Sequence, residues 1–593
     1  MRIATNRNHA RPVVFNLFLA LICAAGAFCV DKAQAMITVG PASDTACQYH
    51  DLGVAVQAAG QSPGFDLIAI SGGPWTGQTT ITEHDNDGLI IEGGFANCSA
   101  GVSSGRSTLD GQGAVPAGPL IVHSGNGSLT LLHLILQNGK GAIQSVVAGP
   151  LTLSDVLVYS NHADYGGGLF VSGNDIFRMQ LHLISSSINS NSAIVNGGGL
   201  YLSTVDVSIT GGSNILGNIA QGPNGTSDGG GIYAIDANIL VNDHAVPPFA
   251  FIGNNYAQRN GGGVYYATSR AGNYEMLLWN DRASQPLLVA ENAAQNQGGA
   301  FYISSNSTDQ QIFSFAGFEN AIVRQNEAYE GAAIYAFSSG SGASVGTQIQ
   351  FAQSMPGDSI PACAVGLECN AIDDNHSIGG SVVEVNVGGS TASASFLMYR
   401  GRMRGNRGGA LIGGSAYMQI ESSLLASNEI GQGGGLIFNI SNDLHIANST
   451  IAYNTIAGNA LFTVVLPPAS LEILHSLFVQ PTQSVSAYIL GTGVPVTVRD
   501  IGTKNVFFDQ GTNVQNLADP FVNGANGDFH ISISSSAVNR WAPSGDPNDP
   551  PPTLDLDGAM RPFSFNPNPT PYDFGAYEAG ASVDVIFRNG FDP

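Results

Sequence analysis

The sequence predicts an all-β fold: a right-handed parallel β-helix solenoid with a short helical cap at its N-terminus. Composition is the first of three observations behind this prediction. Glycine occupies 76 of the 593 positions and charged residues make up only 11%, and so many glycines would be costly inside helices. The other two are a glycine-centred phrase that recurs along the chain and the short β-rich runs between its copies. The formal net charge of -24 excludes a basic nucleic-acid-binding surface, so no nucleic-acid partner is expected.

The first 35 residues have the features of a secretory signal peptide. Arg2, Arg7 and Arg11 precede the apolar run 13–30, and Ala-Gln-Ala at 33–35 forms a small-x-small cleavage pattern. Removal of residues 1–35 would leave a chain with 16 basic and 43 acidic groups. We therefore expect a soluble, acidic protein that is secreted or associated with the outer membrane at the surface of a Gram-negative bacterium, without a transmembrane segment. A retained membrane anchor is the alternative.

Four cysteines remain after position 35. Their positions favour the pairs Cys47–Cys98 and Cys363–Cys369, out of three possible pairings. Both disulfides would suit an oxidising compartment. A zinc site is the rival interpretation, but the sequence contains no CxxC pair and no nearby pair of histidines.

Residues 36–62 are predicted to form an N-terminal cap that contains one short helix. Leu52, Val56 and Ala59 would share a face of that helix, Asp51 can cap its start and Gly60 can end it. A cap is expected because the exposed terminal coil of a β-helix is an edge that would otherwise pair with other chains.

Residues 63–515 are predicted to form the β-helix, because one phrase recurs through them. It consists of an asparagine, a short spacer, two or three small residues, an aliphatic residue and an aromatic residue. The first glycines of the six clearest copies follow at steps of 31, 32, 32, 37 and 33 residues and are Gly166, Gly197, Gly229, Gly261, Gly298 and Gly331. Repeats of this length indicate a solenoid or a propeller, but a propeller blade needs about 40–45 residues. The short strand-like runs without a helical period therefore favour the β-helix.

Stacking of the coils assigns a direction to each repeated side chain. Strands of successive coils lie about 4.8 Å apart, and neighbouring residues of a strand point to opposite faces. The aliphatic residue after each glycine cluster should point inward: Leu169, Leu200, Ile232, Val264, Phe301 and Ile334. The next residue should point outward: Phe170, Tyr201, Tyr233, Tyr265, Tyr302 and Tyr335. We expect the glycines in positive-φ turns, and the recurrent asparagine in a left-handed bend with its amide bonded to the next coil.

Several segments resemble a known group of proteins. Gly298-Gly-Ala-Phe301, Gly408-Gly-Ala-Leu411 and Phe251-Ile-Gly-Asn254 resemble the repeats of polymorphic outer-membrane proteins and other pectin-lyase-like right-handed β-helices. Residues 516–580, which include Asp573-Phe-Gly-Ala-Tyr-Glu578, resemble the closing segment of secreted bacterial β-helix proteins of the choice-of-anchor type. Residues 581–593 look like a short tail shared by some secreted Gram-negative proteins. The resemblance implies the fold but little about activity, because this fold hosts many functions.

A pair of carboxylates, Asp373-Asp374, lies two residues before His376 and is the best candidate for acid–base chemistry. It superficially resembles the paired aspartates of β-helical polysaccharide hydrolases, but the companion motifs NTD and GHG of those enzymes are absent. The alternative interpretation is a solvated acidic loop.

Two features predict binding rather than catalysis. Arg400, Arg402 and Arg404 alternate, so they would share one strand face and form an anion-binding ridge, unless acidic neighbours on adjoining coils pair with them. The outward aromatic column would form a platform for sugars, unless the rings only cover the sheet and pack on one another.

A calcium site is the only cofactor that the sequence suggests. Asp546, Asp549, Asp555 and Asp557 cluster near the exit of the β-helix, although their spacing matches no defined calcium loop. Use of these residues in structural turns is the alternative.

The functional expectation is a secreted or surface-displayed, non-catalytic, adhesin-like rod. Its aromatic column and arginine ridge would bind extracellular glycans or cell-surface components. The alternative is a polysaccharide lyase or glycoside hydrolase of the β-helix class.

Overall fold

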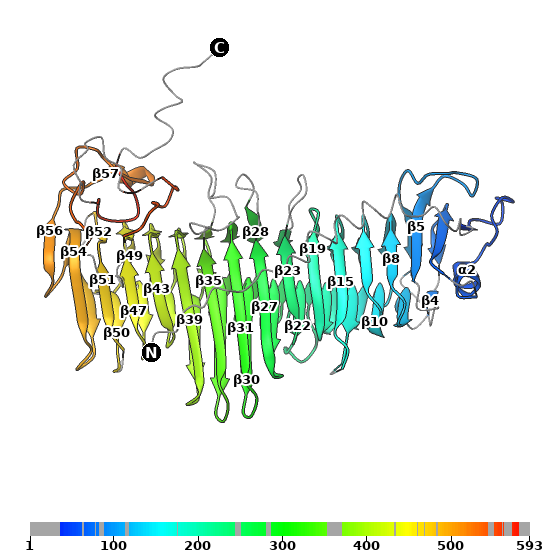
Figure 1. The fold of residues 1–593 in the computed structure, drawn as a ribbon, viewed down its shortest axis with the longest axis horizontal. Coiled ribbons are helices and arrows are strands. Elements are labelled where there is room, and N and C mark those ends of the chain that lie inside the picture. The colour runs from blue at the N-terminus through cyan, green and yellow to red at the C-terminus, as the bar shows by residue number, and fades with distance from the viewer. Residues whose placement is uncertain are drawn as a thin grey trace, which may run out of the picture.

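The structure is a computed structural model that describes residues 36–61, 64–76, 79–81, 88–112, 118–174, 176–242, 251–279, 286–352, 370–431, 435–458, 460–467, 469–481, 484–543, 551–559, 561 and 572–579. The described residues form parallel sheets of 31, 15 and 10 strands, whose strands pair from coil to coil. Figure 1 shows the coils stacked side by side into a rod. The predicted all-β parallel β-helix is confirmed.

The ten coils from β13 (His162–Tyr165) to β49 (Thr455–Ile456) contribute strands to all three sheets, whereas the described coils at the two ends contribute none to the 10-stranded sheet. In one coil, β14 (Leu169–Ser172) belongs to the 15-stranded sheet, β15 (Met179–Ile184) and β16 (Ser187–Asn189) belong to the 31-stranded sheet, and β17 (Ser192–Asn196) belongs to the 10-stranded sheet. The next coil repeats this order in register, so that Leu169 pairs with Leu200. Equivalent residues therefore form columns along the rod.

The 15-stranded sheet carries the predicted aromatic column on its outer face. Its strands in order are β4 (Thr79–Ile81), β7 (Ile121–Gly125), β10 (Ile143–Ala148), β14, β18 (Leu200–Ser203), β22 (Ile232–Ile235), β26 (Val264–Thr268), β30 (Phe301–Ser307), β34 (Ile334–Gly340), β38 (Ser381–Gly388), β42 (Ala410–Gly414), β46 (Ile437–Asn439), β50 (Ala460–Val464), β53 (Val485–Leu490) and β55 (Val506–Phe507).

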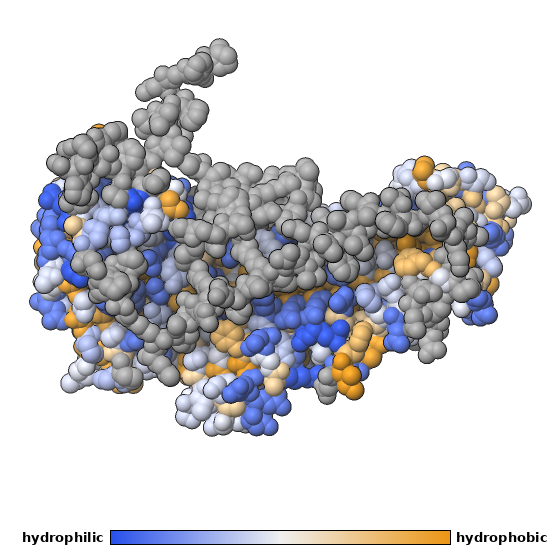
Figure 2. Space-filling view, viewed as in Figure 1, coloured by the Kyte–Doolittle hydropathy of each residue, from blue (hydrophilic) through white to orange (hydrophobic). Residues whose placement is uncertain are grey.

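The interior of the rod is one continuous apolar column. All six aliphatic or aromatic residues predicted to point inward, from Leu169 to Ile334, have at most 2% exposure. The strand alternation confirms this part of the sequence prediction. The visible face in Figure 2 has hydrophilic residues gathered at mid-length, with small separate apolar patches beside them.

A buried asparagine ladder connects ten successive coils. Its members are Asn161, Asn191, Asn218, Asn255, Asn292, Asn326, Asn375, Asn406, Asn428 and Asn454. In each step the Nδ2 and the backbone N–H of one asparagine donate to the Oδ1 of the next, as Asn255 does to Asn292 over 2.9 and 3.2 Å. The predicted amide-to-amide bonding is confirmed.

The predicted backbone conformation of these asparagines is wrong. The left-handed residue is the one before each asparagine, for example Asn254 with φ 54° and Glu291 with φ 58°. The chain turns at that preceding residue, and the asparagine itself begins the next strand direction with its side chain buried. The first glycine of each cluster does have positive φ, as at Gly229 with φ 68°.

The N-terminal end is covered by β1 (Ile37–Val39) and α2 (Leu52–Ala59). The backbone N–H of Val54 donates to the Asp51 carboxylate over 2.9 Å, and Leu52, Val56 and Ala59 are buried. The predicted helix, its cap and its buried face are confirmed. β1 already pairs in parallel with β2 (Asp66–Ser71), so the segment 36–62 also contributes a strand to the sheet.

The residues after β56 (Thr512–Asn516) turn back onto the outside of the rod. They include the antiparallel pair β57 (Phe521–Asn523) and β58 (Asp528–Ile531). Figure 1 shows this closing segment above the C-terminal coils rather than across their end. Its apolar residues pack on outward side chains of β44 (Leu424–Ala426), β48 (Thr450–Ala452) and β52 (Leu477–Val479).

Candidate functional site

The outward aromatic column forms a stacked ladder along the 15-stranded sheet. Consecutive ring centroids lie 4.7–5.4 Å apart and the ring planes differ by 7–21°. The ladder consists of Phe170, Tyr201, Tyr233, Tyr265, Tyr302 and Tyr335. Because the rings are nearly parallel, each inner ring has both faces covered by its neighbours. The outer surface of the ladder therefore presents ring edges and phenol hydroxyls.

Burial within the stack changes the chemistry of the hydroxyls. It raises the pKa of Tyr233 and of Tyr302, and the neighbouring tyrosines and Asp228 add to the rise. The hydroxyls therefore stay protonated and can both donate and accept hydrogen bonds.

A row of polar residues runs beside the ladder. It consists of Tyr165, Asn196, Asp228, Asn260, Gln297 and Glu330, which follow one another from coil to coil. Three bonds connect members of this row: Asp228 N–H donates to Asn196 Oδ1 over 2.9 Å, Asn260 N–H donates to Asp228 over 3.0 Å, and Gln297 Nε2 donates to Glu330 over 3.0 Å. We call these six residues the polar row.

Arg259 is the cation beside the polar row. Its Nε donates to Asp228 over 2.9 Å and its terminal nitrogen makes a second, shorter contact with the same carboxylate. The Asp228 side chain is 1% exposed whereas that of Arg259 is 42% exposed. The bidentate contact raises the pKa of Arg259. The guanidinium is thus fixed in position but still open to solvent.

The ladder ends at Glu384, which pairs with Tyr335 across the next coil. Burial raises the pKa of the Glu384 carboxyl, and bonds from Ser381 and Asn386 oppose that rise. Sequence reasoning missed both this residue and the polar row. The sequence does contain a signal for this coil. Asn375 is followed by Ser-Ile-Gly-Gly-Ser at 377–381, which takes the place of the glycine cluster, and Glu384 comes shortly after it.

The three arginines of the predicted ridge do not share one face. Arg400 has φ 50° and lies in a bend before β40 (Arg402–Arg404). Its side chain is buried beneath the closing segment, where Nε donates to the Asp555 carbonyl oxygen over 2.9 Å. Only Arg402 and Arg404 alternate on a strand, because the bend redirects the chain after Arg400.

Asp373 and Arg402 form an ion pair. Asp373 is the last residue of β36 (Ala371–Asp373), and its Oδ2 accepts from Arg402 over 2.6 Å. Their side chains are 9% and 14% exposed. This contact agrees with the alternative in which acidic residues of adjoining coils partner the ridge.

The other two members of the candidate catalytic group point elsewhere. Asp374 is exposed at the bend, with φ 54°, and His376 begins β37 (His376–Ser377) in the 10-stranded sheet. His376 Nδ1 lies 4.0 Å from the Glu327 carboxylate. A catalytic role of Asp373, Asp374 and His376 therefore stays a prediction that no converging geometry supports.

Of the four candidate calcium ligands, Asp546 and Asp549 lie outside the described residues. The Asp555 carboxylate accepts from the backbone N–H groups of Ala559 and Glu578 over 2.8 and 3.2 Å. Asp557 contacts His530 Nε2 over 2.6 Å. Asp555 and Asp557 thus have protein partners of the kind expected for structural turns.

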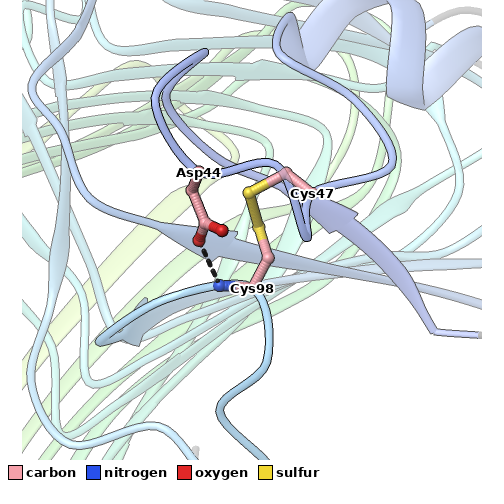
Figure 3. A group of neighbouring side chains, drawn as sticks. All are labelled: Asp44, Cys47 and Cys98. Atoms are coloured by element: carbon pink, nitrogen blue, oxygen red, sulfur yellow. Dashed lines mark hydrogen bonds between the residues drawn. A yellow bond between two sulfur atoms is a disulfide. The ribbon is translucent and has the colours of Figure 1, made fainter.

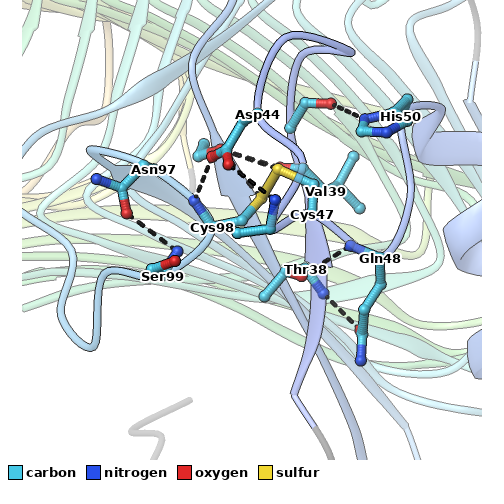
Figure 4. The surroundings of a disulfide bond; sticks show 12 residues. Thr38, Val39, Asp44, Cys47, Gln48, His50, Asn97, Cys98 and Ser99 are labelled. Atoms are coloured by element: carbon cyan, nitrogen blue, oxygen red, sulfur yellow. Dashed lines mark hydrogen bonds between the residues drawn. A yellow bond between two sulfur atoms is a disulfide. The ribbon is translucent and has the colours of Figure 1, made fainter.

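The predicted Cys47–Cys98 disulfide is confirmed, and the pair Cys363–Cys369 lies outside the described residues. Asp44 lies beside the bond and accepts from the Cys98 N–H over 2.8 Å (Figure 3). Asp44, Cys47 and Cys98 are close enough to suggest a metal site, but the disulfide consumes both thiolates that a metal would need. The surrounding bonds in Figure 4, such as Gln48 N–H to Thr38 Oγ1, join β1 to the following turn.

Comparison with known proteins adds no family. A scan of the chain against models of protein families finds no match, and a search among curated proteins finds no similar sequence. In the described ranges, no helix combines the length and apolar character needed to span a membrane.

Proposed function

We propose that this protein is an exported, adhesin-like binding rod of the pectin-lyase-like β-helix class, which retains extended glycans along its aromatic ladder without cleaving them. The features of residues 1–35 support export, as does the Cys47–Cys98 disulfide, which is typical of oxidising compartments. The observation that carries the proposal is the aromatic ladder with the polar row beside it.

The geometry favours binding by ring edges and hydroxyls rather than by ring faces. A ligand that stacks on an aromatic ring needs a free face, and the inner rings of the ladder have none. Their hydroxyls instead form a row that repeats once per coil, next to amides and carboxylates. A polymer rich in hydroxyl groups can follow this row, and many weak contacts along one chain add up to useful affinity.

The decisive experiment removes hydroxyls while keeping the stack. The triple variant Tyr233→Phe, Tyr265→Phe, Tyr302→Phe loses three hydrogen bonds to the ligand. It should bind any polysaccharide that the wild type retains at least about 10-fold more weakly. Binding is measured on a panel of immobilised polyuronates, neutral glycans and whole cells. Tyr417→Phe is the matched control, because Tyr417 lies in β43 (Tyr417–Glu421) of the 31-stranded sheet and bonds Gln419.

Two results would overturn the proposal. One is the absence of any retained polymer in the panel, and the other is equal retention by the triple variant and wild type. The enzymatic alternative makes a different prediction: polysaccharide is cleaved, and Asp373→Asn with Asp374→Asn abolishes product release. The ion pair between Asp373 and Arg402 gives that alternative less support.

A further inference from the structure

A cleft near the N-terminal end of the rod brings together a serine, a histidine, an arginine and two carboxylates. It has a volume of about 520 Å³ and is lined by Ser103, Arg106, His133 and Asp155, together with the turn 104–105 and Ile135. Glu92 contacts both the serine and the histidine of this cleft. The aromatic ladder lies on a different sheet.

The stacked coils position the acidic residues and the histidine. Glu92 of β5 (Leu89–Phe95) pairs with Leu132 of β8 (Leu129–Leu132), which pairs with Ser154 of β11 (Leu151–Ser154). His133 and Asp155 are the next residues after β8 and β11, and both occupy left-handed bends with φ 53° and 54°. They therefore lie one coil apart on the same edge of the rod.

The loop between β5 and β6 (Ser107–Asp110) brings the serine and the arginine over this edge. The backbone N–H of Ser104 donates to the Gly94 carbonyl over 2.8 Å, which holds the loop against the end of β5. Arg106 contacts Asp155 twice, through Nε to its carbonyl oxygen over 3.2 Å and through a terminal nitrogen to its carboxylate over 2.5 Å.

The cleft brings a hydroxyl, an imidazole and two carboxylates close to one another. Ser103 Oγ lies 3.2 Å from His133 Nδ1, and His133 Nε2 lies 3.9 Å from Asp155 Oδ2. Ser103 Oγ also donates to Glu92 Oε1 over 2.7 Å, and that oxygen lies 3.3 Å from His133 Nδ1. An activated hydroxyl nucleophile needs a base within reach and a third group that orients the base. Here Glu92 lies at Nδ1 of the imidazole, and Asp155 lies within ion-pair distance of Nε2.

We propose that this cleft is a serine-dependent esterase site. Ser103 Oγ turns its proton from Glu92 to His133 Nδ1 as it attacks the ester carbonyl, and the Arg106 guanidinium in the lining of the cleft stabilises the resulting oxyanion. Collapse of the tetrahedral adduct breaks the bond to the alcohol, which leaves with the proton from His133, and Ser103 is acylated. Water then repeats the sequence with the same base and releases the carboxylic acid. Asp155 and Glu92 stabilise the imidazolium formed in both halves.

The lining of the cleft indicates the substrate class. Ile135 is its one apolar side chain, and the remaining groups donate or accept hydrogen bonds. A short acyl group on a polyhydroxylated alcohol fits this lining, in which a longer acyl chain would meet Ile135 as the one apolar side chain. The site goes beyond the proposed binding function and does not depend on it.

The test uses the full chain purified after export. Hydrolysis of p-nitrophenyl acetate and labelling by a fluorophosphonate probe, mapped by peptide mass spectrometry, should both identify Ser103. Ser103→Ala and His133→Gln should lower the hydrolysis rate about 100-fold or more, which is the usual contribution of a nucleophile and its base. Ser99→Ala is the matched control, since Ser99 is exposed in the same loop but does not line the cleft, and it should keep the wild-type rate.

The outcomes separate this proposal from the binding function. Absence of label at Ser103, or a rate unchanged by Ser103→Ala in a chain with a wild-type dichroism spectrum, overturns the esterase site. Hydrolysis of p-nitrophenyl octanoate as fast as the acetate overturns the short-acyl assignment. Neither result changes the polysaccharide retention of the tyrosine variants.

Discussion

Each member of the asparagine ladder supplies buried hydrogen bonds that join its coil to the neighbouring coils. Asn292, for example, donates through Nδ2 to the Ile252 carbonyl oxygen over 3.0 Å and to Asn326 Oδ1 over 3.0 Å. It also accepts from both the backbone and the side chain of Asn255. All of these groups are buried, so water cannot replace a lost partner.

Asn292→Ala should lower the free energy of unfolding by about 2–4 kcal/mol, because it leaves donors of Asn255 without an acceptor. The measurement is the shift of the denaturant midpoint relative to wild type. Asn273→Ala is the control, since Asn273 is exposed in the neighbouring strand β27 (Gly272–Trp279). Equal midpoints for the two variants would contradict a structural role of the ladder.

The closing segment packs on the rod through an apolar cluster, and buried charges hold the segment itself together. Arg561 has a fully buried ion pair with Glu578 over 2.9 Å, and its terminal nitrogen donates to the Asp573 and Gly575 carbonyls. His475 of the rod stacks on Trp541 of the segment with centroids 3.7 Å apart. Burial raises the pKa of Asp555 to about 6 and of Asp573 to about 6. The stability of the closing segment therefore depends on protonation.

His530 makes the closing segment sensitive to pH in the neutral range. It lies between Asp557 and Asp528, 2.6 Å from each, and packs on the Tyr577 ring. The two carboxylates, Asp557 first, raise the pKa of His530 from 6.5 to about 9. The stabilisation is thus complete below pH 6.5 and is lost as the pH rises through about 9. Asp555 and Asp573 act in the same direction at lower pH, because their folded-state pKa values lie above 3.8.

Amide protection of β57 and β58 should therefore fall as the pH is raised from 6 to 9.5, after correction for intrinsic exchange. His530→Gln should remove most of the change above pH 6.5. The effect is moderate, because the His530 side chain is 44% exposed and its ion pairs are screened by solvent. His162→Gln, in the 10-stranded sheet, should retain the wild-type pH profile, and a flat profile in the wild type would contradict the role of His530.

Local periodicity was enough to predict the coils, their inward residues and the outward ladder. The period of two in a strand fixes these directions without reference to the rest of the chain. The coil that begins at Asn375 was missed because residues 353–369 lengthen the step and Glu384 stands where an aromatic residue was expected. The contact between Arg400 and Asp555 joins residues 155 positions apart, and no local pattern encodes it. The structure therefore departs from the sequence prediction more at the candidate sites than in the fold.

The two ends of the rod are protected differently. At the N-terminal end α2 packs against β1 and β2. The Cys47–Cys98 disulfide joins the turn after β1 to the segment just after β5. At the other end, within the described residues, β56 pairs only with β54 (Val496–Lys504), and most of its residues are exposed. Figure 1 shows the closing segment beside this end and not across it. Because coils contact only their neighbours, loss of structure should begin at an end and progress inward.

Hydrogen exchange should therefore be fastest in β54 and β56 and slowest in central strands such as β26 and β30. Replacing Cys47 and Cys98 by serine frees a loop with a sequence separation of 51 residues, which lowers local stability by about 4 kcal/mol in the chain-entropy account. The variant should gain a second fast zone confined to β1, β2 and β5, while exchange in β54 and β56 stays at the wild-type rate. Uniform exchange along the rod, or equal acceleration at both ends in the variant, would show that the coils unfold as one cooperative unit instead.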